Sequence, residues 1–297
     1  VSSAASDVYK RQESVRTYNP ELADRLTKMQ EAIAATPKDI TIDLSGVVSR
    51  IVTYLQTSQQ QLVTINRQNK ELVDLEGQAL KLNRNLAASK LQAFLRMAQR
   101  VDERDPDNSV ASLQVAALAE TIGQLLDLPT LQLRRLRLAG LLYRIGLAEA
   151  PKEVFTQTPD QLNDSSYAFW RDRATLGAQL LSTMPELKAI KEIVGHQLEH
   201  WDGSGKPSGL KGEENGIESR ILGLVSYFQE LTQPRGDRPP LSLGEALEKC
   251  ESRRETWFDP NLLDTLGNIV RLAEMGLMCL PSRPSQLPAI WLEEATK

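Results

Sequence analysis

The sequence of 297 residues is poor in several residue types on which many functional sites depend. It has only two histidines and two cysteines, Cys250 and Cys279, and two cysteines are too few for a disulfide framework. We therefore expect the reducing environment of the cytoplasm. The net charge of −4 lacks the basic excess that is typical of nucleic-acid-binding proteins. No apolar run approaches the roughly 20 residues of a membrane-spanning helix. We therefore predict neither a nucleic-acid partner nor a membrane span.

The rest of the composition is ordinary for a globular protein. Hydrophobic residues make up 41% of the chain and charged residues 25%. The length suffices for one large core with an extension, or for two domains. Apolar residues recur at helical spacing in several segments, such as 20–35 and 110–126, so we predict an all-α fold.

The sequence pattern divides the chain into five parts. Residues 7–12 resemble the translation of a transposon-end adapter used in sequencing libraries. We therefore expect residues 1–12 to be derived from an adapter, with a disordered tail as the alternative. The other expected parts are a remnant or linker of an upstream segment (13–45), a long signalling or dimerisation helix (46–100), a helical domain (101–280) and a C-terminal tail (281–297).

The long helix carries a heptad pattern. Segment 47–95 has no proline and a single glycine, Gly77. Near the seam positions lie the residues Leu55, Leu62, Ile65, Leu72, Ala79 and Leu86. Asn69, Glu76 and Asn83 occupy the alternate positions, where a buried asparagine can fix the register of a parallel dimer. A coiled-coil homodimer is one interpretation, although Glu76 weakens the seam. A helix packed along its own domain is the other.

Both histidines lie in one stretch, residues 193–210. We predict a helix that ends near Trp201, on which His196 and His200 share a face because they are four residues apart. A loop follows that is too rich in glycine to be helical. The chemistry of the protein should therefore be sought in this stretch.

This stretch resembles the signature of HD-GYP domains, which has the sequence His-His-Glu-Arg-Trp-Asp-Gly-Ser-Gly-Tyr-Pro followed by a Gly-Leu-Lys-Gly-Glu turn. The matching residues are Glu199, Trp201, Asp202, Gly203, Ser204, Gly205, Pro207 and the segment 209–213. Further matches in the family's order include Glu103–Pro106, the Ile145-Gly146 pair and Phe258–Pro260. The resemblance covers residues 101–277. It implies an HD-GYP-like helical bundle in segment 101–280, and a family whose active members are metal-dependent cyclic di-GMP phosphodiesterases.

The positions that hold metal in this family carry other residues here. The defining His-Asp pair is Tyr143-Arg144, the next histidine is Arg173, and the His-His pair is Gln197-Leu198. A further histidine is replaced by Ala111, and the distal aspartate by Ser226. Such ions bind neutral imidazoles and carboxylates, and a guanidinium repels a cation. We therefore expect no catalytic residue, no metal ligand and no cofactor.

The resulting hypothesis is a catalytically inactive HD-GYP-like regulatory or interaction domain of a bacterial signal-transduction protein. Its expected partner is a signalling protein, with a GGDEF-type protein as one candidate. The family associates the loop Trp201, Asp202, Gly203, Ser204, Gly205 and Pro207 with partner recognition, but this loop could equally be a turn that the fold requires. A competing hypothesis is a metal-dependent cyclic di-GMP phosphodiesterase, which would need a divalent metal.

Two further hypotheses rest on a few residues each. If Arg144 and Arg173 both point into the former metal cavity, they would form a pocket for an anion such as a nucleotide phosphate. Each could instead pair with a nearby carboxylate such as Glu149 or Asp172. The order His196-x-x-Glu199-His200 also matches the inverted zinc-peptidase motif, but nothing in the sequence marks a third ligand.

Overall fold

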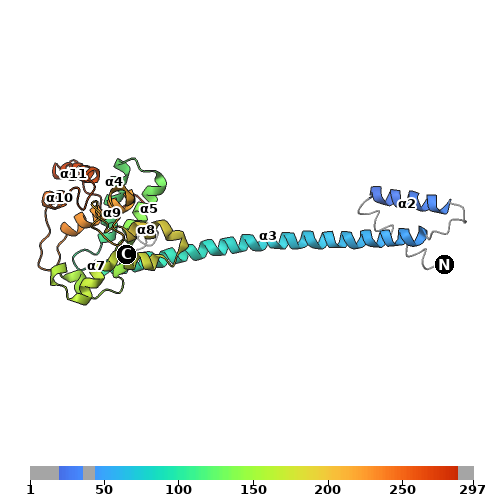
Figure 1. Ribbon diagram of the computed structural model, residues 1–297, viewed down its shortest axis with the longest axis horizontal. Helices are drawn as coiled ribbons and strands as arrows, with labels where there is room; N and C mark the ends of the chain where they lie inside the picture. The colour runs from blue at the N-terminus through green and yellow to red at the C-terminus, as the bar shows by residue number, and fades with distance from the viewer. Residues whose placement is uncertain (1–19, 36–43, 287–297) are drawn as a thin grey trace. The chain divides into compact units, whose positions relative to one another are not determined.

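The computed structural model describes residues 20–35 and 44–286 (Figure 1). Within these ranges every named element is a helix, and the only β-pairing is two isolated bridges, Arg235–Arg238 and Arg254–Phe258. The prediction of an all-α fold is confirmed. The expected adapter-derived segment, residues 1–12, lies outside the described residues.

The chain divides into two compact units within one helix, between Asn83 and Arg84. The first unit holds α2 (Pro20–Ala34) and most of α3 (Leu44–Glu103). No helix in the described ranges is long and apolar enough to cross a membrane. The predicted boundaries between the other parts of the chain stay a prediction.

The second unit is a bundle of helices (Figure 1). It contains the end of α3, followed by α4 (Ala111–Leu125), α5 (Thr130–Leu142), α6 (Glu153–Thr156), α7 (Asp164–Leu181), α8 (Lys188–Gly195), α9 (Ile217–Leu231), α10 (Leu243–Glu251) and α11 (Pro260–Glu274). Four short 3₁₀ turns, Ile145–Leu147, Pro159–Gln161, Pro185–Leu187 and Gly212–Glu214, lie between them.

Helix α4 lies at the centre of this bundle because nearly all of its faces are buried. Its alanines favour the helix and take little space, so neighbouring helices approach closely. A Cβ atom at Gly140 of α5 would lie 2.6 Å from the Cα atom of Ala116. The core around α4 is aliphatic and includes fully buried Ile122, Leu222 and Leu262.

Several helices begin at polar caps that the local sequence supplies. Asp259 caps α11 by accepting from the backbone N–H of Asn261, and Pro260 occupies the first helical position. Ser242 and Glu245 form a capping box at the start of α10. These caps fix where α10 and α11 start, beside the end of α9.

The beginning of the predicted C-terminal tail is attached to the bundle. The backbone N–H and the hydroxyl of Ser285 both donate to the buried carboxylate of Glu120 in α4. The same carboxylate accepts from Arg137 of α5 at 2.8 Å. The tail therefore follows the domain surface as far as Gln286, the last described residue.

Candidate functional site

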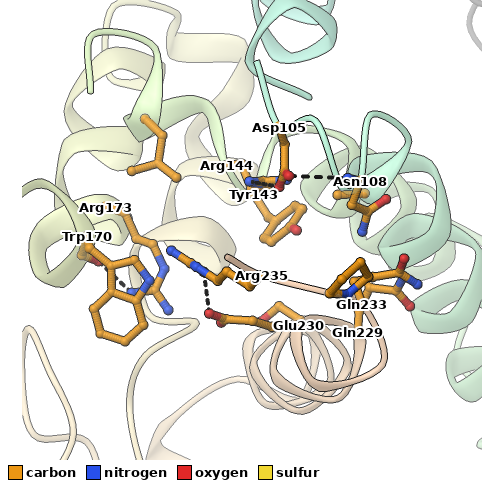
Figure 2. A pocket seen from close by; sticks show the side chains of 14 residues that line it. Asp105, Asn108, Tyr143, Arg144, Trp170, Arg173, Gln229, Glu230, Gln233 and Arg235 are labelled. Atoms are coloured by element: carbon orange, nitrogen blue, oxygen red, sulfur yellow. Dashed lines mark hydrogen bonds and ion pairs between the residues drawn. The ribbon is translucent and has the colours of Figure 1, made fainter. Parts of the chain in front are cut away.

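Several of the positions that the family resemblance matched to metal ligands lie together in the bundle. Tyr143 and Arg144 follow α5, Arg173 lies on α7, and Ser226 lies on α9. These side chains and Ala111 line a cavity of about 60 Å³ (Figure 2). The fold thus brings together positions that are far apart in the sequence.

Gln197 and Leu198, at the matched His-His pair, line a second and larger cavity. The Nε2 atom of Gln197 donates to the carbonyl oxygen of Tyr143 at 3.1 Å and to that of Val194 at 3.0 Å. Gln197 therefore connects the end of α8 to the end of α5, a structural role that needs an amide rather than a metal ligand.

Arg144 is fixed by two carboxylates from the end of α3 and the following turn. Its Nη2 atom donates to Asp105 Oδ2 at 2.7 Å (Figure 2). Its Nη1 atom lies 3.7 Å from Asp102 Oδ1. Only 11% of the Arg144 side chain and 4% of the Asp102 side chain are exposed. The sequence suggested Glu149 or Asp172 as its partner, and the structure gives Asp105 and Asp102 instead. The charge of Arg144 is thus compensated within the protein.

Asp102 is a buried carboxylate with further partners. It accepts from the backbone N–H of Ser112 at 2.8 Å and from the hydroxyl of Ser112 at 3.0 Å. Burial raises the pKa of Asp102 from 3.8 to about 6, although Arg144 and Ser112 act in the opposite direction. The ionised form of Asp102 is therefore disfavoured because burial removes the water that would solvate the carboxylate.

This raised pKa predicts a pH dependence of stability. Because the native state binds the proton more tightly than the unfolded state, stability falls as the pH rises from about 4 to about 6. The difference between the pKa of Asp102 in the native state and in the unfolded state corresponds to about 3 kcal/mol. The Asp102→Asn variant should lack this contribution, so its free energy of unfolding, measured by urea titration from pH 4 to pH 7, should decrease less with pH. Identical pH profiles would contradict the assignment.

Arg173 differs from Arg144 because no described carboxylate lies within ion-pair distance of it. Its guanidinium lies 4.2 Å from the ring centre of Trp170, and Nη1 donates to the carbonyl oxygen of Trp170 at 2.5 Å. Burial lowers the pKa of Arg173, and the charge of Glu230 acts against this effect. Asp172 pairs with Arg171 instead. Arg173 therefore offers its charge to both cavities, whose walls it shares.

The larger cavity is a groove of about 720 Å³ beside the first one. It is within the size range of small-molecule sites. Three carboxylates line it: Asp160, Glu199 and Glu230. Six basic side chains line it: Arg171, Arg173, Lys206, Arg235, Arg238 and Arg253. The groove therefore has an excess of positive charge, although the chain as a whole is acidic.

Aromatic rings and guanidinium groups combine at two places in the groove. At the first, Tyr167 and Trp170 are stacked with ring centres 6.1 Å apart, and Arg173 lies over Trp170. At the second, the Arg253 guanidinium lies 3.5 Å from the ring centre of Trp257, against which His200 is stacked at 4.4 Å. We call these the Trp170 platform and the Trp257 platform. Both combine aromatic rings with positive charge, and the positive charge attracts anions.

The loop that matches the family signature is held by Glu199. Its carboxylate accepts from the backbone N–H groups of Ser208, Gly209 and Leu210 at 2.6 to 3.1 Å. A Cβ atom at Gly205 would lie 2.2 Å from the backbone nitrogen of His200, so only glycine fits there. These contacts explain Glu199 and Gly205 as parts of the turn itself.

Replacing Glu199 with alanine should loosen this loop. Three N–H groups would lose a charged acceptor, so we expect a loss of about 1.5–3 kcal/mol in the free energy of unfolding. Hydrogen exchange of the amides of residues 208–210 should become faster. The Glu213→Ala variant removes an exposed glutamate nearby and should change neither quantity. Unchanged amide exchange in Glu199→Ala would contradict this role.

The other residues of the loop lie in different places. Ser204 and Gly205 line the groove, and Trp201 lines a third, much smaller cavity. Asp202 is exposed and accepts from the backbone N–H of Ser204 at 2.8 Å, and Pro207 is exposed as well. The described loop thus presents one side to the groove and the other to solvent.

The prediction of one helical face for both histidines was wrong. Helix α8 ends at Gly195, and His196 follows its last residue. His200 Nδ1 lies 2.8 Å from Ser204 Oγ, while Glu199 is engaged by the loop. Within residues 20–35 and 44–286, no three or more His, Cys, Asp or Glu side chains are grouped so that they could hold a metal ion. The described residues thus lack the arrangement that the zinc-peptidase hypothesis needs.

Most of the groove's basic residues were not singled out from the sequence. Arg235 bridges Glu230 to the carbonyl oxygens of Val154 and Gln157, so it ties the loop after α9 to α6. The spacing of Trp170 and Arg173 on α7 could have indicated a stacked pair, because residues three or four apart share a helical face.

Comparison with protein families gives two matches. Residues 81–262 match the profile described as HD domain. Residues 8–64 match a profile described as the C-terminal domain of a two-partite extracellular sensor domain. The first match contains all the residues of both cavities.

The curated relatives are phosphodiesterases. The chain is 32% identical to the 3'3'-cGAMP-specific phosphodiesterase 1 of Vibrio cholerae over 51% of this chain and 35% of that protein. It is 26% identical to the cyclic di-GMP phosphodiesterase response regulator RpfG of Xanthomonas campestris over 67% of this chain and 54% of that protein. The chain therefore spans between about a third and about half of these relatives.

Among solved structures, similarity extends to the HDG"Y"P protein Bd1817 of Bdellovibrio bacteriovorus. The TM-score is 0.46 at 18% identity, covering 55% of this chain and 52% of that one. A cyclic GMP-AMP-specific phosphodiesterase of V. cholerae has a TM-score of 0.45 at 22% identity, covering 68% and 57%.

The prediction that no cofactor is involved was wrong. The HD domain match and the phosphodiesterase relatives point to a divalent metal ion. The side chains at the matched positions do not fit such an ion, because Arg144 and Arg173 are cationic and the carboxylates that line the small cavity, Asp105 and Glu230, are paired with Arg144 and Arg235.

Proposed function

Because the chain belongs to the HD domain family, we propose that its helical domain binds a cyclic dinucleotide in the groove and holds it without hydrolysis. The domain would act as a regulatory part of a bacterial signalling protein in the cytoplasm. The observation that carries this proposal is the pair of stacking platforms, each with a guanidinium group, in one cationic groove.

The charges of the groove favour a phosphate ligand. Arg173, Arg238 and Arg253 have no ion pair with a described carboxylate, so their charges are available. Two of the acidic side chains in the groove have other partners and do not neutralise these arginines. Glu199 accepts from three backbone N–H groups, and Glu230 pairs with Arg235. Guanidinium groups bind phosphate with two parallel hydrogen bonds, which supports a ligand that carries phosphates.

The rings of the groove favour a ligand with planar bases. Stacking of a base on an aromatic side chain contributes about 1–3 kcal/mol per base. Two platforms suit a ligand with two bases, and the curated relatives are named for cyclic di-GMP and 3'3'-cGAMP. A cyclic dinucleotide combines two bases with two phosphates in one molecule of suitable size.

The groups near the small cavity do not favour hydrolysis. A general base must accept a proton, and a guanidinium cannot release one to become such a base. The carboxylates of Asp102 and Asp105 are engaged by Arg144, and that of Glu230 by Arg235. These ion pairs support binding without cleavage.

Titration calorimetry with the full chain tests the proposal. We expect cyclic di-GMP or 3'3'-cGAMP to bind with a dissociation constant of about 1–100 μM, and GMP and inorganic phosphate to bind more weakly. The affinity should fall as the salt concentration rises, because the groove is cationic. The absence of binding by both cyclic dinucleotides at millimolar concentration would contradict the proposal.

A second candidate is a working metal-dependent phosphodiesterase, and the names of the relatives favour it. Chromatography of the reaction mixture after addition of Mn²⁺ or Fe²⁺ distinguishes the two. Linear dinucleotide or mononucleotide that accumulates in proportion to protein concentration would favour this candidate.

We also propose that the solvent-facing side of the signature loop contacts a signalling protein, with a GGDEF-type protein as the first candidate to test. Asp202 and Pro207 are exposed there, which supports a docking role. An Asp202→Arg variant should weaken co-sedimentation with such a partner, whereas the exposed Asp107→Arg variant should not. Equal binding by both variants would contradict the role of the loop.

A further inference from the structure

Helix α3 carries an apolar face that no described residue covers. Every residue from Gln61 to Leu86 is exposed. Among them are large apolar side chains, with Leu72 56%, Leu75 59% and Leu82 68% exposed. At about 1.5 Å per residue this segment extends over roughly 40 Å, and helices in proteins gain most of their stability from the packing of an apolar face.

The charges and most apolar residues of this segment lie on different faces. With Leu62 at heptad position a, the exposed apolar residues Ile65, Leu72, Leu75, Leu80, Leu82 and Leu86 fall at positions d, e and g. The charged residues Arg67, Lys70, Glu71, Asp74, Lys81 and Arg84 fall at b, c and f. The exceptions are Glu76 at position a and Val63 at position b. Such a division indicates one helical face for association and one for solvent.

Two asparagines on the apolar face indicate which kind of helix would pair with it. Asn69 and Asn83 both occupy position a and are two heptads apart. An asparagine at this position is best matched by the same residue of a second, parallel chain. Only a parallel arrangement in register matches both asparagines at once, whereas an antiparallel one places position a against position d.

We propose that residues 62–86 of α3 pair in parallel and in register with the same segment of a second copy of this chain. Glu76 then faces its own equivalent, which weakens the pairing and keeps it reversible. The two helical domains would follow the paired segments at the same end. This inference is independent of the groove and its ligand.

Disulfide trapping in the full chain tests the arrangement. In a Cys279→Ser background, which leaves only buried Cys250, Asn69→Cys should form a disulfide-linked dimer under mild oxidation. Lys81→Cys, on the solvent face, should stay unlinked. Equal cross-linking of both variants would overturn the parallel, in-register arrangement.

Sedimentation equilibrium tests the association itself. We expect a dimer of the full chain at micromolar concentration, at least tenfold weaker association for Leu72→Asp, and no change for Lys81→Asp. Glu76→Leu should strengthen the association. A wild-type chain that is monomeric over the whole concentration range would overturn the proposal.

Discussion

The Arg144→Ala variant should lose about 3–5 kcal/mol of the free energy of unfolding, because it leaves buried carboxylates without their counter-charge. Asp102 is 4% and Asp105 14% exposed, so water cannot easily replace the guanidinium. The variant would also lose the contact of Arg144 with the ring of Phe155. Chemical denaturation at pH 7 measures this effect.

The loss should itself depend on pH. Arg144 lowers the pKa of Asp102, so its removal raises that pKa further above about 6. At low pH the protonated carboxyl needs no counter-charge, whereas at high pH the native state must bear an uncompensated carboxylate. The difference between wild type and variant should therefore grow as the pH rises from 5 to 8.

A matched control is Arg171→Ala. Arg171 also pairs with an aspartate at 2.7 Å, but its side chain is 48% exposed and its charge is screened by water, so the variant should unfold with nearly the same free energy as the wild type. An equal and small loss in both variants would contradict the structural role of Arg144.

The Arg173→Gln variant should weaken binding of cyclic di-GMP by about 10–100-fold, which is the effect of losing a charge-assisted hydrogen bond. Arg173 has no carboxylate partner among the described residues, lies over Trp170 and borders both cavities. Its removal should therefore change affinity more than stability. Calorimetry measures the first and thermal unfolding the second.

The control for this prediction is Arg134→Gln. Arg134 is an exposed arginine of α5 that does not line the groove, and the variant carries the same change of charge. It should bind the ligand as the wild type does. If both variants weaken binding equally, the effect comes from net charge, and Arg173 has no specific role.

The fold class could be predicted from the sequence because the helical periodicity is strong. The order of the family motifs also predicted that positions far apart in the sequence lie close together in the fold. Tyr143, Arg173 and Ser226 do line one cavity. The partners of Arg144 were not foreseen. Both Asp102 and Asp105 lie in another element, and the nearer candidates, Glu149 and Asp172, are excluded only by three-dimensional packing.

The end of α8 was also mispredicted. The apolar spacing before Gly195 suggested a longer helix, whereas the chain leaves the helix there and Glu199 binds the following loop. The groove could not be foreseen from single motifs, because Arg173, Arg235 and Arg253 come from three different segments of the chain. Their joint positive charge is a property of the tertiary structure.

The most direct test is to incubate excess protein with cyclic di-GMP and Mn²⁺, separate bound from free ligand by rapid filtration, and analyse both by chromatography. We predict that the ligand is retained by the protein and recovered intact. Recovery of linear dinucleotide or GMP, or ligand found only in the filtrate, would contradict binding without hydrolysis.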